Sequence, residues 1–171
     1  MVVTAAIKTK KFTTMIQYYK GDVLSALGTS ETETKVLIHI CNNKGGWGKG
    51  FVTSLSKKWK EPEKFYRNYF GLNYQNKLGD IQQCCPIKNV YVVNMIAQNG
   101  YKSVFNKCPL DYDALTVCLK KISDWLIYMG IDSPSIYCPK IGAGLAGGDW
   151  DIIKPILKKE LANFPINVYE L

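Results

Sequence analysis

Two glycine-rich segments hold the residues with the clearest capacity for chemistry. They are HICNNKGGWGKGF, residues 39–51, and PKIGAGLAGGDW, residues 139–150. Each follows a short apolar run and precedes a stretch with helical periodicity. A glycine-rich turn between a strand and a helix exposes backbone N–H groups beside a helix N-terminus, which favours phosphate. The pair predicts a site for a ligand with two phosphates, or for one diphosphate held from both sides. The alternative is that both segments are only tight turns.

Neither segment matches a familiar nucleotide motif in its full context. The Walker A pattern fails because Lys49 is followed by Gly50 and Phe51 rather than by serine or threonine. The second segment spells GxGxxG with Gly142, Gly144 and Gly147. A dinucleotide-binding fold is nevertheless disfavoured, because the rest of its sheet would have to precede this motif in permuted order.

Three side chains near these segments could take part in acid–base or phosphate chemistry. His39 is the only histidine, and a histidine with an unperturbed pKa near 6.5 exchanges protons at neutral pH. Asp149 stands where a helix begins, so it is either a catalytic carboxylate or a plain N-cap. Lys49 could neutralise a terminal phosphate or simply face solvent. The sequence has no CxxC pair and no acidic cluster, so we expect neither a metal nor a cofactor.

Hydrophobic periodicity predicts the elements that must position these residues. The expected strands are residues 15–19, 36–41, 81–85, 90–96, 136–138 and 166–171, with a turn at 86–89. The expected helices are residues 51–59, 62–70, 111–129 and 149–163. This alternation predicts an α/β fold with a central mixed, mostly parallel sheet flanked by helices.

The composition fits one globular domain over residues 1–171, with its core from about residue 15. The chain has 47% hydrophobic residues, six cysteines and a net charge of +8. The positive charge favours an anionic partner, although scattered lysines also serve solubility. No apolar run approaches the ~18 residues of a membrane span, and no signal peptide is evident. Because most cysteines lie in apolar runs, we expect reduced thiols and a cytoplasmic protein.

With residues 21–22 upstream, the two segments resemble the macro domain family of ADP-ribose-binding proteins. The resemblance rests on YYKGDVL, VLIHICNNKGGWGKGF, VYVVNMIAQNGY, IYCPKIGAGLAGGDW and VYEL, in that order, and covers about residues 15–171. The nearest branch is that of the phage and yeast-type ADP-ribose 1''-phosphate phosphatases, beside the TARG-type deADP-ribosylases. It implies a three-layer α/β/α fold.

The resemblance also implies a role for individual residues. Asp22, with the Val23 N–H beside it, would bind the adenine amino group, and Asn42 would bind the distal ribose. Trp47 would cover that ribose. The remaining ligand-binding residues are expected around the distal ribose and its phosphate (Asn43, Gly46, Gly48, Gly50 and Phe51), the diphosphate (Ile141, Gly142, Ala143, Gly144, Leu145 and Ala146) and the adenine (Tyr169 and Leu171).

Departures from the family limit what the resemblance implies about catalysis. TARG-type enzymes use a lysine nucleophile and an aspartate, but VVNMIAQNG contains no lysine and Ala146 occupies the aspartate position. The candidate catalytic residues are therefore His39, Asp149 and Asn42. We expect a monomer that binds ADP-ribose and hydrolyses ADP-ribose 1''-phosphate to ADP-ribose and phosphate. The alternatives are a non-catalytic ADP-ribose reader and a deADP-ribosylase acting on ADP-ribosylated protein or nucleic acid.

Overall fold

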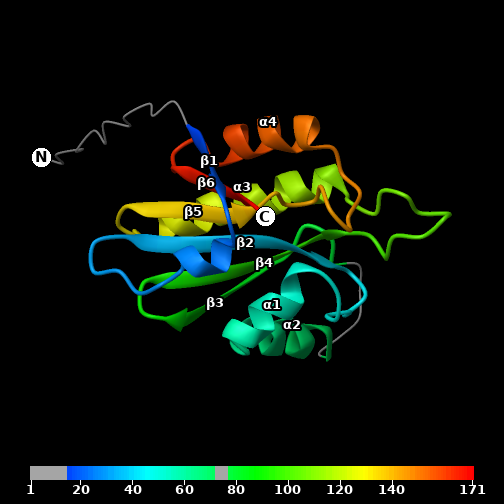
Figure 1. Ribbon diagram of the computed structural model, residues 1–171, viewed down its shortest axis with the longest axis horizontal. Helices are drawn as coiled ribbons and strands as arrows, with labels where there is room; N and C mark the ends of the chain where they lie inside the picture. Colours follow the sequence, from blue (N-terminus) through cyan, green and yellow to red (C-terminus); the bar gives the residue numbers. More distant parts are fainter. Residues whose placement is uncertain (1–14, 72–76) are drawn as a thin grey trace, which may run out of the picture.

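The fold is a six-stranded sheet covered by helices on both faces (Figure 1). The computed structural model describes residues 15–71 and 77–171. The strands run β1 (Ile16–Lys20), β2 (Thr34–Asn42), β3 (Ile81–Ile87), β4 (Val90–Gln98), β5 (Pro134–Pro139) and β6 (Ile166–Glu170). Their order across the sheet is β1-β6-β5-β2-β4-β3. Every neighbouring pair is parallel except β3 and β4, which form an antiparallel hairpin.

Helices cover the two faces of the sheet in separate pairs. They are α1 (Phe51–Lys58), α2 (Glu61–Gly71), α3 (Tyr112–Tyr128) and α4 (Trp150–Glu160), with a 3-10 turn η1 (Val23–Ala26) after β1. The apolar faces of α3 and α4 pack on one side of the sheet, and those of α1, α2 and η1 pack on the other. The predicted three-layer α/β arrangement with a mostly parallel sheet is therefore confirmed.

The central strands are apolar along almost their whole length because both faces are covered. In β4, every residue from Val92 to Ala97 is buried, and the matching run of β2 is buried from Val36 to His39. The predicted elements are all present, with ends that differ by a few residues. The 3-10 turn η1 is an addition, and its N-cap, Asp22, accepts a hydrogen bond from the Leu24 N–H at 2.9 Å.

The parallel direction of the strands decides where the site must lie. The carboxyl ends of β1, β2, β4, β5 and β6 meet at one edge of the sheet, so the segments that follow them converge there. Both glycine-rich segments belong to this group. Within the described residues, no helix is both long and apolar enough to cross a membrane.

Candidate functional site

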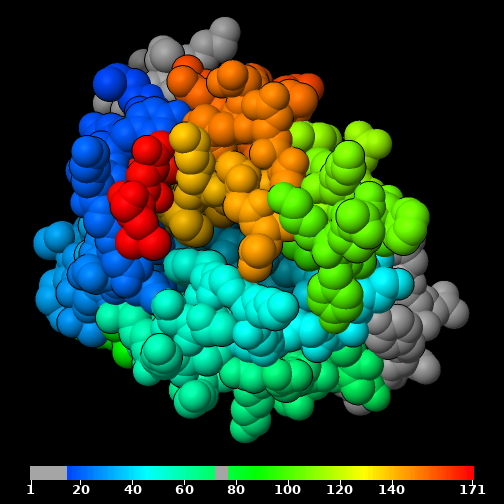
Figure 2. Space-filling view, turned by 45° about the vertical axis from the view of Figure 1, so that its right-hand side comes forward, coloured from blue at the N-terminus to red at the C-terminus, as the bar shows by residue number. Residues whose placement is uncertain are grey.

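A cavity of about 840 Å³ lies at the carboxyl edge of the sheet, between the two glycine-rich segments. We name residues 43–50 the first glycine loop and residues 140–149 the second glycine loop. The end of β2 and the residues after β4 complete the lining. Figure 2 looks toward this hollow, with the cyan atoms of the first loop and α1 facing the orange atoms of the second. The sequence prediction that the two loops share one site is consistent with this geometry.

The two loops touch across the cavity at Gly50 and Leu145. A Cβ atom added at Gly50 would lie 2.9 Å from Leu145 Cδ1, and Gly50 has a φ of +76°. A larger residue at this position would therefore strain the backbone and displace the Leu145 side chain. Leu145 itself is 56% exposed, so the contact stands at the mouth of the cavity and not in the core.

Backbone N–H groups on both sides of the cavity lack a protein acceptor. Among the described residues, those of Gly48, Lys49 and Gly50 in the first loop donate no hydrogen bond within the protein. The same holds for the N–H groups of residues 144–146 in the second loop. All six residues line the cavity. Two short runs of available backbone donors, one on each loop, are suited to binding an anion between them.

The glycines of these loops are of two kinds: close packing requires glycine at some positions and does not require it at others. A Cβ at Gly148 would lie 2.3 Å from Leu110 Cδ2, and one at Gly147 would lie 2.3 Å from the Lys107 carbonyl oxygen, so the fold itself requires these glycines. Gly48 and Gly144 are different, because a Cβ there meets nothing within 4 Å and neither has a positive φ. Neither φ nor a neighbour among the described residues requires glycine at these two positions, both of which border the cavity.

Asn42 organises the first loop with its side chain. Its Nδ2 donates to the Gly46 carbonyl at 2.7 Å, and its Oδ1 accepts from the N–H groups of Lys44 and Gly46 at 2.9 and 3.1 Å. The Tyr66 hydroxyl donates to the same oxygen at 2.9 Å. The amide oxygen thus serves three donors within the protein, and the roles expected for Asn42 at the ribose and in catalysis stay predictions. Asn42 shapes the loop that lines the cavity.

Asn43 joins the first loop to the segment after β4. Its Oδ1 accepts from the Gly100 N–H at 2.9 Å, and its Nδ2 donates to Asn99 Oδ1 at 3.1 Å. The side chain is buried and lies outside the cavity lining. Direct ligand contact by this side chain is therefore not supported. Its position supports a role in holding two neighbouring loops together.

Trp47 supports the first loop from beneath, and its expected contact with the ribose stays a prediction. The residue is only 7% exposed, and its indole packs against Tyr66 with the ring centroids 5.2 Å apart. Its Nε1–H donates to Ser56 Oγ at 2.8 Å, and Ser56 in turn donates to Glu63. A tryptophan buried by apolar neighbours with its N–H satisfied is a packing residue. One part of it still borders the cavity.

His39 lies in the floor of the cavity and is 1% exposed. Burial lowers the pKa of His39 to about 4, because the charged imidazolium loses its hydration. Its ring packs against Trp47 and Phe51, with centroid separations of 5.6 Å to each. Its Nε2 is 2.6 Å from Asn94 Oδ1. A pKa this low makes His39 a weak base, and its expected part in catalysis stays a prediction.

Asp149 is the N-cap of α4. Its Oδ1 accepts a hydrogen bond from the Asp151 N–H at 2.9 Å, and its own N–H donates to the Tyr112 hydroxyl. The residue is exposed and does not line the cavity. Of the two predictions for Asp149, the geometry matches that of a plain helix N-cap. It gives no support to the other prediction, that of a catalytic carboxylate.

The residues expected around adenine gather at the neighbouring strand ends. The Gly21 N–H donates to the Glu170 carbonyl at 2.8 Å, which places Asp22 beside the end of β6. The rings of Tyr19 and Tyr169 stack there, 5.0 Å apart. Asp22 and Leu171 are exposed, whereas Val23 is buried. These positions extend the carboxyl edge beyond the cavity, whose lining does not include them.

The charges around the cavity have one sign. Among the described residues, its lining contains Lys49, Lys102 and Lys140 but no aspartate or glutamate. Lys140 is paired with Glu170, with Nζ 3.1 Å from Oε1. Within residues 15–71 and 77–171, no group of three or more histidine, cysteine or acidic residues is placed to hold a metal ion. The lining therefore favours an anionic ligand.

Several lining residues were not anticipated from the sequence. Tyr101 and Lys102, after β4, border the cavity, and Asn94 holds His39 from the neighbouring strand. A signal for Asn94 existed, since a lone polar residue inside VVNMIA calls for a buried partner. No comparable signal marked Tyr101 or Lys102, because a loop sequence alone does not say which cavity it borders.

Comparisons with known proteins place the chain in a family. No protein-family model matches it. A yeast protein named ADP-ribose 1''-phosphate phosphatase, from Scheffersomyces stipitis, is 36% identical over 173 residues, which cover 91% of this chain and 99% of that protein. A solved macrodomain protein from Streptomyces coelicolor has a TM-score of 0.74 and 32% identity, covering 92% of this chain and 99% of that one. A protein of unknown function from Bacteroides thetaiotaomicron has a TM-score of 0.82 and 41% identity over 92% and 99% of the two chains. The chain belongs to the macrodomain family.

Proposed function

We propose that this protein binds ADP-ribose and hydrolyses ADP-ribose 1''-phosphate to ADP-ribose and inorganic phosphate. The observation that carries the proposal is the pair of opposed N–H runs, residues 48–50 and 144–146, in a cavity lined by lysines and no carboxylates. Such a site suits a diphosphate held between two loops. The name of the Scheffersomyces stipitis relative supports the reaction, and a relative from Candida albicans with the same name is 29% identical over 91% of this chain.

The site residues support a reaction driven by electrostatics more than by a strong base. Water attacks phosphorus, the bond from phosphorus to the sugar oxygen breaks, and that oxygen takes up a proton as it leaves. Phosphoryl transfer from a monoester passes through a loose transition state, so positioning and charge stabilisation provide most of the rate. Backbone donors and lysines supply these effects without the neutral, buried His39 acting as the base.

The proposal also covers the domain organisation, the oligomeric state and the cellular environment of the protein. We propose that residues 1–171 form one domain that acts as a monomer in a reducing cytoplasm. All six cysteines lie among the described residues, and all are free thiols. An ADP-ribose unit carried by a macromolecule would be a further ligand of the same cavity.

A specific observation favours a second function, that of a non-catalytic reader. The cavity lining contains no carboxylate, and its single histidine has a pKa of about 4. A site whose histidine is so weak a base favours binding of an anion over its hydrolysis. The two functions predict the same ligand contacts and differ only in turnover.

One experiment separates the two functions. The purified protein is incubated with ADP-ribose 1''-phosphate, and released phosphate is measured against a heat-denatured control, with calorimetry on ADP-ribose in parallel. Phosphate release together with ADP-ribose binding supports the phosphatase. Binding without release would make the protein a reader, and the absence of both would overturn the proposal.

A further inference from the structure

Two lysines without acidic partners stand at the mouth of the cavity. Lys49 belongs to the first glycine loop and Lys102 to the segment after β4. Within the described residues, neither forms an ion pair or a side-chain hydrogen bond, whereas Lys140 pairs with Glu170. Both are exposed and both line the cavity. Binding of a diphosphate by the loop backbones does not explain why two unpaired positive charges lie at the mouth of the same cavity.

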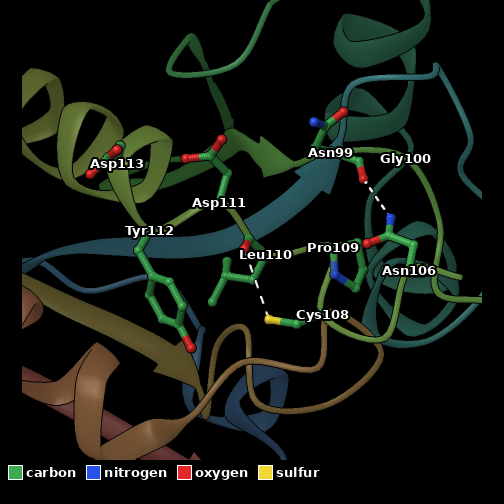
Figure 3. Close-up of a pocket in the computed structure, with 9 residues that line it drawn as sticks. All are labelled: Asn99, Gly100, Asn106, Cys108, Pro109, Leu110, Asp111, Tyr112 and Asp113. Atoms are coloured by element: carbon green, nitrogen blue, oxygen red, sulfur yellow. Dashed lines mark hydrogen bonds between the residues drawn. The ribbon is translucent and has the colours of Figure 1, made fainter.

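The segment that carries Lys102 is a braced loop, residues 99–110, which we name the 99–110 loop. At its base the Asn99 N–H donates to the Pro109 carbonyl at 2.8 Å. Asn106 Nδ2 donates to the Asn99 carbonyl at 3.0 Å (Figure 3). It also donates to the Tyr101 carbonyl at 3.2 Å. Asn43 ties this base to the first glycine loop. These bonds hold the loop in one position relative to the cavity.

Tyr101 brings the 99–110 loop directly against the first glycine loop. A Cβ added at Gly46 would lie 2.2 Å from the Tyr101 hydroxyl oxygen, so only glycine permits this approach. The next residue along the chain is Lys102. The close approach brings the chain at Lys102 next to the first glycine loop, and both Lys102 and Lys49 line the same cavity.

The two sides of the 99–110 loop differ in charge. Its other side borders a second hollow of about 720 Å³, seen in Figure 3, which is lined by Asp111 and Asp113 and by no lysine. The side facing the main cavity carries lysine and no carboxylate. An anion is therefore attracted to one side of the loop and repelled from the other.

We propose that Lys49 and Lys102 form a subsite for a terminal phosphate monoester, separate from the backbone donors that bind the diphosphate. A phosphate monoester carries close to two negative charges at neutral pH. Two ammonium groups match that charge, and each makes charge-assisted hydrogen bonds to phosphate oxygens. The subsite makes the cavity selective for ADP-ribose that bears a phosphate over ADP-ribose itself. This inference rests on the proposed function and adds a specificity-determining pair to it.

The experiment compares two ligands with and without the terminal phosphate. Calorimetry at fixed ionic strength uses ADP-ribose and its 1''-methylenephosphonate analogue, in which a CH₂ group replaces the bridging oxygen so that no hydrolysis occurs. The wild-type protein is expected to bind the phosphonate at least ~10-fold more tightly, since each charge-assisted bond contributes more than a neutral one. Lys49→Met and Lys102→Met should each remove most of this preference, because they weaken phosphonate binding far more than ADP-ribose binding.

A matched control comes from the same loop. Lys44 is exposed but does not line the cavity, so Lys44→Met should keep the preference. Lys102→Arg keeps the positive charge, so it should keep part of the preference for the phosphonate that Lys102→Met loses. Equal wild-type affinity for the two ligands would overturn the subsite and leave the proposed function standing. A loss of affinity for both ligands alike in the two methionine variants would also overturn it. Failure of the wild-type protein to bind ADP-ribose at all would instead overturn the proposed function.

Discussion

His39 Nε2 lies 2.6 Å from Asn94 Oδ1, and both residues are 1% exposed at the centre of the sheet. Asn94 Nδ2 donates to the Pro62 carbonyl at 2.9 Å, so the amide is oriented with its oxygen toward the ring. His39 must therefore carry its proton on Nε2 and donate it. The two residues are direct partners in the β2–β4 register, so Asn94 holds His39, which lines the cavity, in a fixed orientation.

The neutral state of His39 predicts how stability depends on pH. Its pKa is about 4 in the folded protein and near 6.5 when unfolded, so the unfolded chain binds more protons between these values. The free energy of unfolding should thus fall as the pH drops from about 6.5 toward 4, by up to about 1.4 kcal/mol per pH unit. Urea titrations at pH 7 and pH 5 measure this difference.

The His39→Gln variant is the control for this pH effect. Glutamine does not titrate, so the variant should lose less stability than the wild-type protein between pH 7 and pH 5. This range lies above the usual titration of carboxylates, which keeps other groups from dominating. An unchanged free energy of unfolding for the wild-type protein across this range would show that His39 titrates normally and is not buried as described.

The strands and helices were predictable because their signals are local. Continuous apolar runs such as residues 90–96 indicated buried strands, and the periodicity of residues 111–129 indicated a helix. The resemblance to macro domains then supplied the layer arrangement. Sheet order was not readable from periodicity, because β1 pairs with β6, which is distant in the sequence.

The roles of polar side chains were much harder to predict. Trp47 among glycines suggested an exposed cover, yet the indole turns inward toward Tyr66 and Ser56. Asn42 and Asp149 were assigned to a ligand or to catalysis, and the structure uses both to satisfy backbone groups. A residue type shows what a side chain can bind, whereas its partner depends on distant segments that only the fold brings near.

Substitution by alanine is expected to affect ligand binding at Gly48 and protein stability at Gly148. Gly48→Ala should leave thermal stability almost unchanged, because its Cβ meets nothing within 4 Å. It should weaken ADP-ribose binding by ~10-fold or more if the ligand occupies that space. Gly148→Ala should lower the free energy of unfolding by about 1–3 kcal/mol, because its Cβ would clash with Leu110. Thermal unfolding and calorimetry on both variants test the contrast, and a Gly48→Ala variant with full ADP-ribose affinity would contradict it.

Asp22 and Asp149 offer a matched test of two capping carboxylates. Each accepts a backbone N–H at 2.9 Å, so alanine at either position should lower stability by about 0.5–2 kcal/mol. Only Asp22 lies at the strand edge expected to bind adenine, so Asp22→Ala should weaken ADP-ribose binding as well. Asp149→Ala should retain both binding and phosphate release. A large loss of phosphate release in Asp149→Ala with ADP-ribose affinity intact would restore Asp149 as a catalytic residue.

The hydrogen-bond chain beneath the first glycine loop predicts a coupled loss of stability and affinity. Trp47 Nε1 donates to Ser56 Oγ at 2.8 Å, and Ser56 Oγ donates to Glu63 Oε2 at 2.7 Å. Ser56→Ala leaves the buried indole N–H without an acceptor, which should cost about 1–3 kcal/mol. The pKa of Glu63, lowered chiefly by the Ser56 hydroxyl, should rise in the variant.

The control is Ser54→Ala, at an exposed position on the same helix. This variant should change neither the free energy of unfolding nor the pKa of Glu63. Chemical denaturation measures the stability, and carboxyl NMR titration follows Glu63. Because Trp47 supports a loop that lines the cavity, the affinity of Ser56→Ala for ADP-ribose should fall together with its stability. If the variant lost stability but bound ADP-ribose as tightly as the wild-type protein, the position of the loop would not depend on the indole beneath it.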